Sequence, residues 1–183
     1  MEFLTIVVLA ILILICVTKL LLAYLGTEDI RVDASSPVEL ESKDENSLVL
    51  VKKLCFYNEG KQCATIMDAI CRSQLPYEQY DGIEVRPKAE REGEVREDDY
   101  FEAVIIQKKG YKGGLDSLNL FAKIKLTPRK GMSLNEALSH MVDLPVDFIW
   151  QETGRAVQHY NKLRIEITAD EIAKLAGVTL VKD

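Results

Sequence analysis

The sequence predicts a mainly β protein: a single N-terminal transmembrane helix followed by an immunoglobulin-like antiparallel β-sandwich with two short helical insertions. Three observations predict this class. The first 25 of the 183 residues are almost wholly apolar. After them come about seven short runs rich in β-branched and aromatic residues, separated by turn residues. Two further stretches carry helix-capping sequences. We therefore expect a transmembrane anchor over 1–26, a polar linker and edge strand over 27–47, and a β-sandwich domain over 48–183.

The apolar run over residues 3–25 is long enough to cross a bilayer. As an α-helix it would extend about 34 Å, against about 30 Å for the hydrocarbon core. Lys19 lies near its C-terminal end, where a long side chain can reach the headgroups, and Tyr24 and Gly26 indicate an interfacial anchor and a helix stop. We expect residues 3–25 to bind the lipid bilayer as a retained signal-anchor, so that the protein is a single-pass membrane protein.

Two other interpretations of this segment fit less well. A cleavable signal peptide would have a basic N-terminal region and a small-residue cleavage site, and neither is present. A type IV pilin would have a basic leader with a Gly before the cleavage site and a Glu shortly after it, and these are missing too.

The side of the membrane follows from Lys19, Arg31 and Lys43, all on the C-terminal side of the span, which favour a cytoplasmic body. An exported body is the alternative.

Composition excludes some partners. The net charge is −6, and the body has no basic stripe in sequence. This argues against nucleic-acid binding, which depends on Lys and Arg contacts to phosphates, and also against a peripheral grip on anionic lipid. The glycines of "GYKGG" (110–114) do not follow a nucleotide-binding pattern and indicate a hairpin turn. We expect no cofactor and no small-molecule substrate.

The strands of the body can be placed from periodicity and turns. We expect an edge strand at 38–41, then a buried strand at 47–58, a hairpin loop at 58–60 with a left-handed Gly60, and a return strand at 62–72 that bends near Asp68. A short strand at 83–86 and a charged loop at 87–99 follow. The remaining strands are expected at 100–110, 117–128, 145–153 and 162–168.

Two short helices are predicted from capping boxes. Ser133 with Glu136 starts one at 133–141, and Thr168 with Glu171 starts another that ends at Gly177. Inward-facing residues are predicted from alternation along two strands. They are Leu118, Leu120, Ala122, Ile124 and Leu126 in the first, and Leu163, Ile165 and Ile167 in the second.

Three cysteines lie close together in "CFYNEGKQCATIMDAIC" (55–71). In the predicted hairpin, Cys55 falls opposite Cys63 at about 5.5 Å between Cα atoms, so a disulfide is possible only if the body is exported, and Cys71 would stay unpaired. On the cytoplasmic side we expect reduced, mostly buried thiols. No Cys-x-x-Cys pair is present, and His140 and His159 lie far away in sequence, so we expect no metal site.

The stretch 150–160 holds the residue types that dominate binding hot spots. Trp150, Arg155, His159 and Tyr160 form a possible partner contact, with the alternative that Trp150 and Tyr160 cap the core. The sequence thus predicts a membrane-anchored, non-catalytic protein-interaction or scaffold module with an unknown protein partner. An envelope or pilus-like assembly subunit is one alternative. A thiol enzyme with scattered site residues such as Cys71 and His159 is another.

Overall fold

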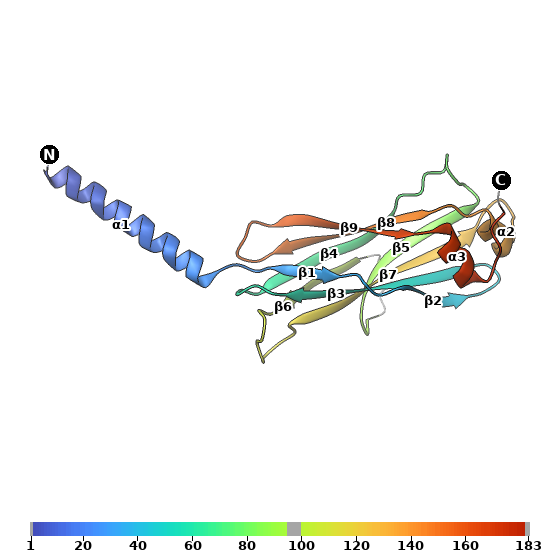
Figure 1. The fold of residues 1–183 in the computed structure, drawn as a ribbon, viewed down its shortest axis with the longest axis horizontal. Coiled ribbons are helices and arrows are strands. Elements are labelled where there is room, and N and C mark those ends of the chain that lie inside the picture. The colour runs from blue at the N-terminus through green and yellow to red at the C-terminus, as the bar shows by residue number, and fades with distance from the viewer. Residues whose placement is uncertain (1, 95–99, 182–183) are drawn as a thin grey trace.

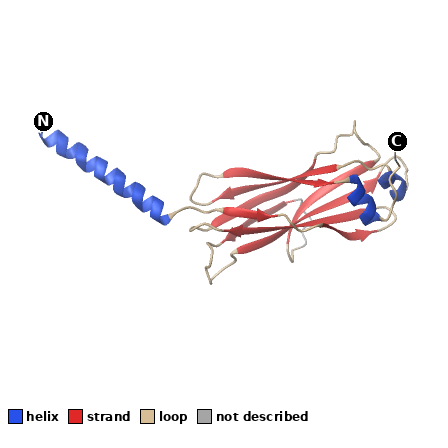
Figure 2. Cartoon of the chain, in the orientation of Figure 1, coloured by secondary structure: helices blue, strands red, loops and turns tan. Residues whose placement is uncertain are grey.

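The computed structural model describes residues 2–94 and 100–181. Figure 1 shows helix α1 (Glu2–Leu25) projecting from one end of an elongated β-sandwich, with the C-terminus at the opposite end. Two antiparallel sheets make up the sandwich, and helices α2 (Leu134–Ser139) and α3 (Ala169–Ala176) are the only other helices in the described part of the chain (Figure 2). The predicted fold class is therefore confirmed.

In the described residues, nine strands form the two sheets. The first sheet has the order β1-β3-β7-β5, and β2 also pairs with β3; its strands are β1 (Ile30–Asp33), β2 (Val38–Lys43), β3 (Leu48–Asn58), β5 (Ile83–Arg91) and β7 (Ser117–Pro128). The second sheet has the order β6-β4-β8-β9, with β4 (Ala64–Ser73), β6 (Tyr100–Ile106), β8 (Leu144–Thr153) and β9 (His159–Ile167).

Helices α2 and α3 begin where their caps predict. The Ser133 hydroxyl accepts a hydrogen bond from the Glu136 backbone N–H at 3.2 Å, and the Glu136 carboxylate accepts one from the Ser133 N–H at 3.4 Å, so the capping box is complete. Before α3 the Thr168 hydroxyl accepts from the Glu171 N–H at 3.2 Å. Gly177, with φ of 69°, ends α3 in the left-handed conformation.

The predicted hairpin between β3 and β4 is wrong. Both sides of β3 are already paired, with β1 and β2 on one side and β7 on the other, while β4 lies between β6 and β8 in the second sheet. Residues 59–63 therefore cross from one sheet to the other. Gly60 is also not left-handed: it is needed because a Cβ there would lie 2.4 Å from the backbone nitrogen of Asp29.

Several strand boundaries differ from the prediction. Strand β6 ends at Ile106 and not at 110, β9 begins at His159 and not at 162, and two further differences lie in the first sheet. Residues 30–33, expected in the linker, pair with the end of β3 as β1. Strand β5 continues to Arg91, through the first part of the predicted charged loop, and residues 95–99 of that loop lie outside the described residues. An edge strand pairs on one side only, so it tolerates Pro87 and a series of charged side chains. The predicted bend at Asp68 is confirmed as a β-bulge, with φ of 49° and a register shift between Met67 and Ile70.

The core lies between the sheets. The five residues of β7 that were predicted to face inward are all buried, and so are Ile165 and Ile167 of β9, while Leu163 is partly buried against the core. Three rings join the two sheets: the ring centroids of Phe56 and Trp150 are 5.1 Å apart, those of Phe56 and Phe148 are 5.9 Å apart, and those of Phe148 and Trp150 are 6.2 Å apart. Aromatic contacts of this kind supply much of a small core's stability.

Removing the central ring should destabilise the sandwich. Phe56→Ala is expected to lower the free energy of unfolding by about 3–5 kcal/mol, because Phe56 is fully buried and the substitution leaves a cavity. Tyr57→Ala is the matched control, since this neighbouring ring is 37% exposed and should cost about 1 kcal/mol or less. Urea denaturation followed by far-UV circular dichroism measures both. Equal losses in the two variants would contradict the assigned register of β3.

Candidate interaction surface at the anchor end

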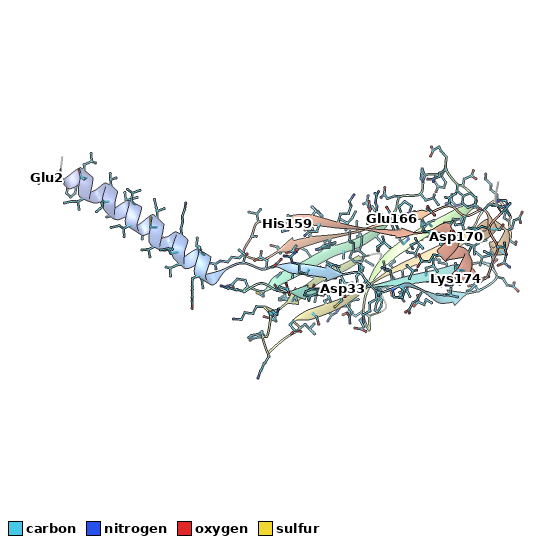
Figure 3. All side chains as sticks on the ribbon, in the orientation of Figure 1. Glu2, Asp33, His159, Glu166, Asp170 and Lys174 are labelled. Atoms are coloured by element: carbon cyan, nitrogen blue, oxygen red, sulfur yellow. The ribbon has the colours of Figure 1, made fainter. Side chains whose placement is uncertain are left out.

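The predicted contact residues lie on the β8–β9 hairpin. Its loop, residues 154–158, is at the end of the sandwich nearest to α1, and Figure 3 places His159 at this end. Arg155, His159 and Tyr160 are exposed, with Tyr160 at 69%. The structure therefore brings three of the four predicted residues to the surface, and whether they bind a partner stays a prediction.

Trp150 is different, because it belongs to the core. It is 6% exposed and contacts Phe56 edge to face, as the core alternative predicted. Tyr160 does not cap the core: its hydroxyl accepts a hydrogen bond from the side-chain amide of Gln151, which in turn accepts one from the amide of Gln158. These contacts hold the Tyr160 ring on the outer surface of the sandwich.

Sequence reasoning missed Val157. Its side chain is 88% exposed at the tip of the hairpin, between Arg155 and His159. The hairpin also has an open edge, because among the described strands β9 pairs with β8 alone. We call Arg155, Val157, His159 and Tyr160 the hairpin surface. Of these residue types, tyrosine and arginine are enriched at the hot spots of protein interfaces.

Glu28 attaches this hairpin to the segment that follows the apolar helix α1. Its carboxylate is buried and accepts hydrogen bonds from the backbone N–H groups of Arg155 at 2.9 Å and Ala156 at 2.8 Å. A Cβ at Gly154 would lie 2.5 Å from the carboxyl carbon of Glu28, so a larger residue there would displace this carboxylate from its hydrogen bonds. The guanidinium of Arg155 also donates to the carbonyl of Gly26 at 3.4 Å.

The β3–β4 loop holds the same segment from the other side. The backbone N–H groups of Glu59 and Lys61 donate to the carbonyls of Asp29 and Thr27 at 2.8 and 2.9 Å. The side-chain oxygen of Asn58 accepts from the Asp29 N–H at 3.2 Å. We call residues 26–29, together with these two loops, the junction. Its hydrogen bonds fix the start of the sandwich directly behind the end of α1.

Two buried carboxylates at the junction have opposite pKa shifts. Burial by itself raises the pKa of Glu28, but hydrogen bonds from its own backbone N–H and from those of Arg155 and Ala156 outweigh it, so the pKa lies below its ordinary value. Burial raises the pKa of Glu152, and the nearby charges of Glu28 and Asp29 add to this, against the lowering effect of His159. The indole N–H of Trp150 also lowers the pKa of Glu152, because it favours the charged carboxylate. The two groups are close but do not meet the geometry of a hydrogen bond.

The predicted cysteine pairing loses its geometric basis. Cys55 in β3 lies opposite Asp33 and Asn119, whereas the exposed Cys63 precedes β4 in the other sheet. All four cysteines are free thiols, and only Cys71 is buried. The prediction of mostly buried thiols therefore holds for one of the three in the body.

The proposed Cys71 and His159 pair is not formed. Cys71 lies opposite Phe148 and His159 opposite Glu152, which separates them by four residues along β8, or roughly 13 Å. Burial raises the pKa of the Cys71 thiol far above its ordinary value, so the reactive thiolate is disfavoured. Among the described residues no group of three His, Cys, Asp or Glu side chains could hold a metal ion.

No family model and no curated protein matches this sequence. Two solved structures are similar at low identity. The GAE domain of yeast GGA1 is 11% identical, and the match covers 75% of this chain and 90% of that one at a TM-score of 0.37. The GAE domain of GGA2p from Saccharomyces cerevisiae is 8% identical, covering 73% of this chain and 99% of that one at a TM-score of 0.30. These values carry no inference about function.

Replacing each of the two carboxylates by the amide of glutamine should change the free energy of unfolding in opposite directions. Glu28→Gln should destabilise the fold at neutral pH by about 1–2 kcal/mol, because it removes charge-assisted hydrogen bonds from two backbone donors. Glu152→Gln should be neutral or stabilising at neutral pH, because it removes a buried charge and keeps an acceptor for the Asn161 amide at 2.9 Å.

The pH dependence provides the check. Glu28 has a lowered pKa, so its contribution is present above the ordinary value of 4.5 and is lost as the pH falls through its folded pKa. Glu152 has a raised pKa, so its ionisation weakens the fold as the pH rises from 4.5 through its folded pKa. Urea denaturation across this range should show the two variants diverging from wild type in opposite directions. Shifts of the same sign would refute the assignment.

Proposed function

We propose that the protein is a single-pass membrane protein whose β-sandwich is a non-catalytic protein-interaction module, held at the cytoplasmic face of the bilayer. Helix α1 supports the anchoring: it has 24 residues, a mean hydropathy of 3.0 in its most apolar window, and no residue buried against the sandwich. A helix so apolar and so exposed would be unfavourable in water. In a bilayer its side chains and its internally bonded backbone are both satisfied.

The hairpin surface is the observation that supports protein binding. Val157, 88% exposed, and the exposed Arg155 lie in the hairpin loop, and Tyr160, 69% exposed, lies on the outer face of the open edge strand β9. His159 is also exposed but points to the other face of β9. Tyrosine and arginine contribute most of the energy in many interfaces, and an open strand edge can pair with an extended segment of a partner.

The junction decides which partners can reach this surface. Because Glu28 bonds the hairpin loop directly behind the end of α1, the hairpin surface would lie next to a bilayer that α1 spans. A partner that binds it must itself approach the membrane. We therefore propose a membrane-associated protein, for which confinement to the same surface raises the effective concentration.

Photocrosslinking tests this proposal. A photoreactive amino acid in place of Tyr160 in the full-length chain, expressed in cells, should give one or a few discrete crosslinked products. Tyr77 is the matched control, because it is the same residue type and is 62% exposed, but it lies in the loop before β5. Products from position 160 that are absent from position 77 are expected. No product at position 160, or identical products at both, would refute the hairpin surface as the contact.

Thiol accessibility tests the side of the membrane. With a membrane-impermeant reagent on intact cells, we expect no labelling of Cys63, because the sandwich is cytoplasmic. After lysis Cys63, which is exposed, should react quickly, and the buried Cys71 only after denaturation. Cys63→Ser is the control that identifies the fast thiol. Labelling of Cys63 in unlysed cells would overturn the orientation.

A further inference from the structure

A recess lies beside the end of α1, between the β3–β4 loop and the β6–β7 loop. Its volume is about 570 Å³, and its lining residues are Tyr24, Leu25, Glu59, Gly60, Lys61, Gln62, Lys108 and Lys109. They come from three segments far apart in sequence. Three of these side chains are cationic and one is anionic, although the whole chain carries −6.

The recess is held in place against the helix. The side-chain amide of Gln62 donates to the carbonyl of Leu25 at 2.8 Å, so the β3–β4 loop closes the last turn of α1. The aliphatic stem of Lys61 lies over Gly26, where a Cβ would be 2.9 Å from the Lys61 Cδ. Gly26 is thus both the helix stop, with φ of 67°, and the surface along which Lys61 runs.

The lysines of the recess are available for a ligand. Lys61 and Lys108 are exposed and form no ion pair with the described residues. Lys109 reaches Glu59 at 3.4 Å, but side-chain exposures of 71% and 46% make this pair weak and easily exchanged. Three ammonium groups around one concave surface therefore have few internal partners.

The position of the recess relative to α1 indicates which class of ligand it would bind. Helix α1 is apolar through Leu25, so the recess begins where the hydrocarbon core ends, and Tyr24, 79% exposed, is the type of ring that lies among headgroups. The ligands present at that depth are lipid phosphates and carboxylates. We propose that Lys61, Lys108 and Lys109 bind the headgroups of anionic lipids in the leaflet from which α1 emerges. This inference rests on the proposed anchoring by α1.

The recess differs from the expectation drawn from net charge. The acidic total argued against contact with anionic lipid, but the fold brings these three lysines together beside the end of α1. Anionic lipids are concentrated in the cytoplasmic leaflet, where each lysine near the surface contributes about a five-fold preference. The recess therefore agrees with the cytoplasmic orientation proposed above.

Native mass spectrometry of the full-length chain in detergent micelles tests the site. The chain is titrated with short-chain phosphatidylserine and, separately, phosphatidylcholine. We expect wild type to prefer phosphatidylserine, and Lys108→Glu to lower that preference about five-fold or more. Lys108→Gln should have an intermediate effect. Lys174→Glu changes net charge equally at the opposite end of the sandwich, on α3, and should leave the preference within about two-fold.

Equal binding of both lipids to wild type, or equal loss in Lys108→Glu and Lys174→Glu, would overturn the site. Displacement of phosphatidylserine by an equal concentration of inorganic phosphate would reassign the recess to free phosphate and would overturn the lipid assignment. Alkaline carbonate extraction of membranes separates this inference from anchoring. If carbonate releases the protein but the preference for phosphatidylserine is intact, only the anchoring is contradicted. If the protein stays in the membrane but shows no preference for phosphatidylserine, only the lipid site is contradicted.

Discussion

One carboxylate links the segment that follows α1 to the β8–β9 hairpin of the sandwich. Glu28 follows the end of α1 by three residues, and its two oxygens accept the backbone N–H groups at the tip of the β8–β9 hairpin. A carboxylate buried without such donors would be unfavourable, so the burial of Glu28 favours the hairpin in this place. Gly60 and Gly154 allow the approach, since a side chain at either would collide with residues 28–29. These contacts make the connection between α1 and the sandwich a hydrogen-bonded joint and not a flexible linker.

This joint gives the anchor end two different surfaces. In the view of Figure 1 the β8–β9 hairpin and the β6–β7 loop lie on either side of the end of α1. The first presents Val157 and Tyr160, and the second contributes Lys108 and Lys109 to the recess. Lipid binding and protein binding would therefore use different sides of the junction and need not compete. Headgroup contacts on one side would restrict the tilt of the sandwich and keep the hairpin surface in a constant orientation.

The sequence predicts those features that depend on local pattern. The alternation along β7, the Ser133 capping box and the stop at Gly26 each follow from residues within a few positions. The joint could not be predicted this way, because it depends on a sheet crossing. Gly60 has the local context of a hairpin glycine, and only the strands already paired on both sides of β3 exclude that hairpin. Likewise, Trp150 and Arg155 are five residues apart, yet one is core and the other surface.

Two loops bring the lysines of the recess together. The β3–β4 loop and the β6–β7 loop both end beside α1, so Lys61 converges with Lys108 and Lys109 although the loops are far apart in sequence. The opposite end carries charges of both signs: the Asp143 carboxylate accepts from the Ala169 N–H at 2.8 Å, Asp170 and Glu171 lie in the first turn of α3, and Lys174 lies in its last turn. An anionic membrane would therefore act mainly on the lysines of the recess. If α1 spans the bilayer, this attraction favours the same orientation of the sandwich as the hydrogen bonds of Glu28.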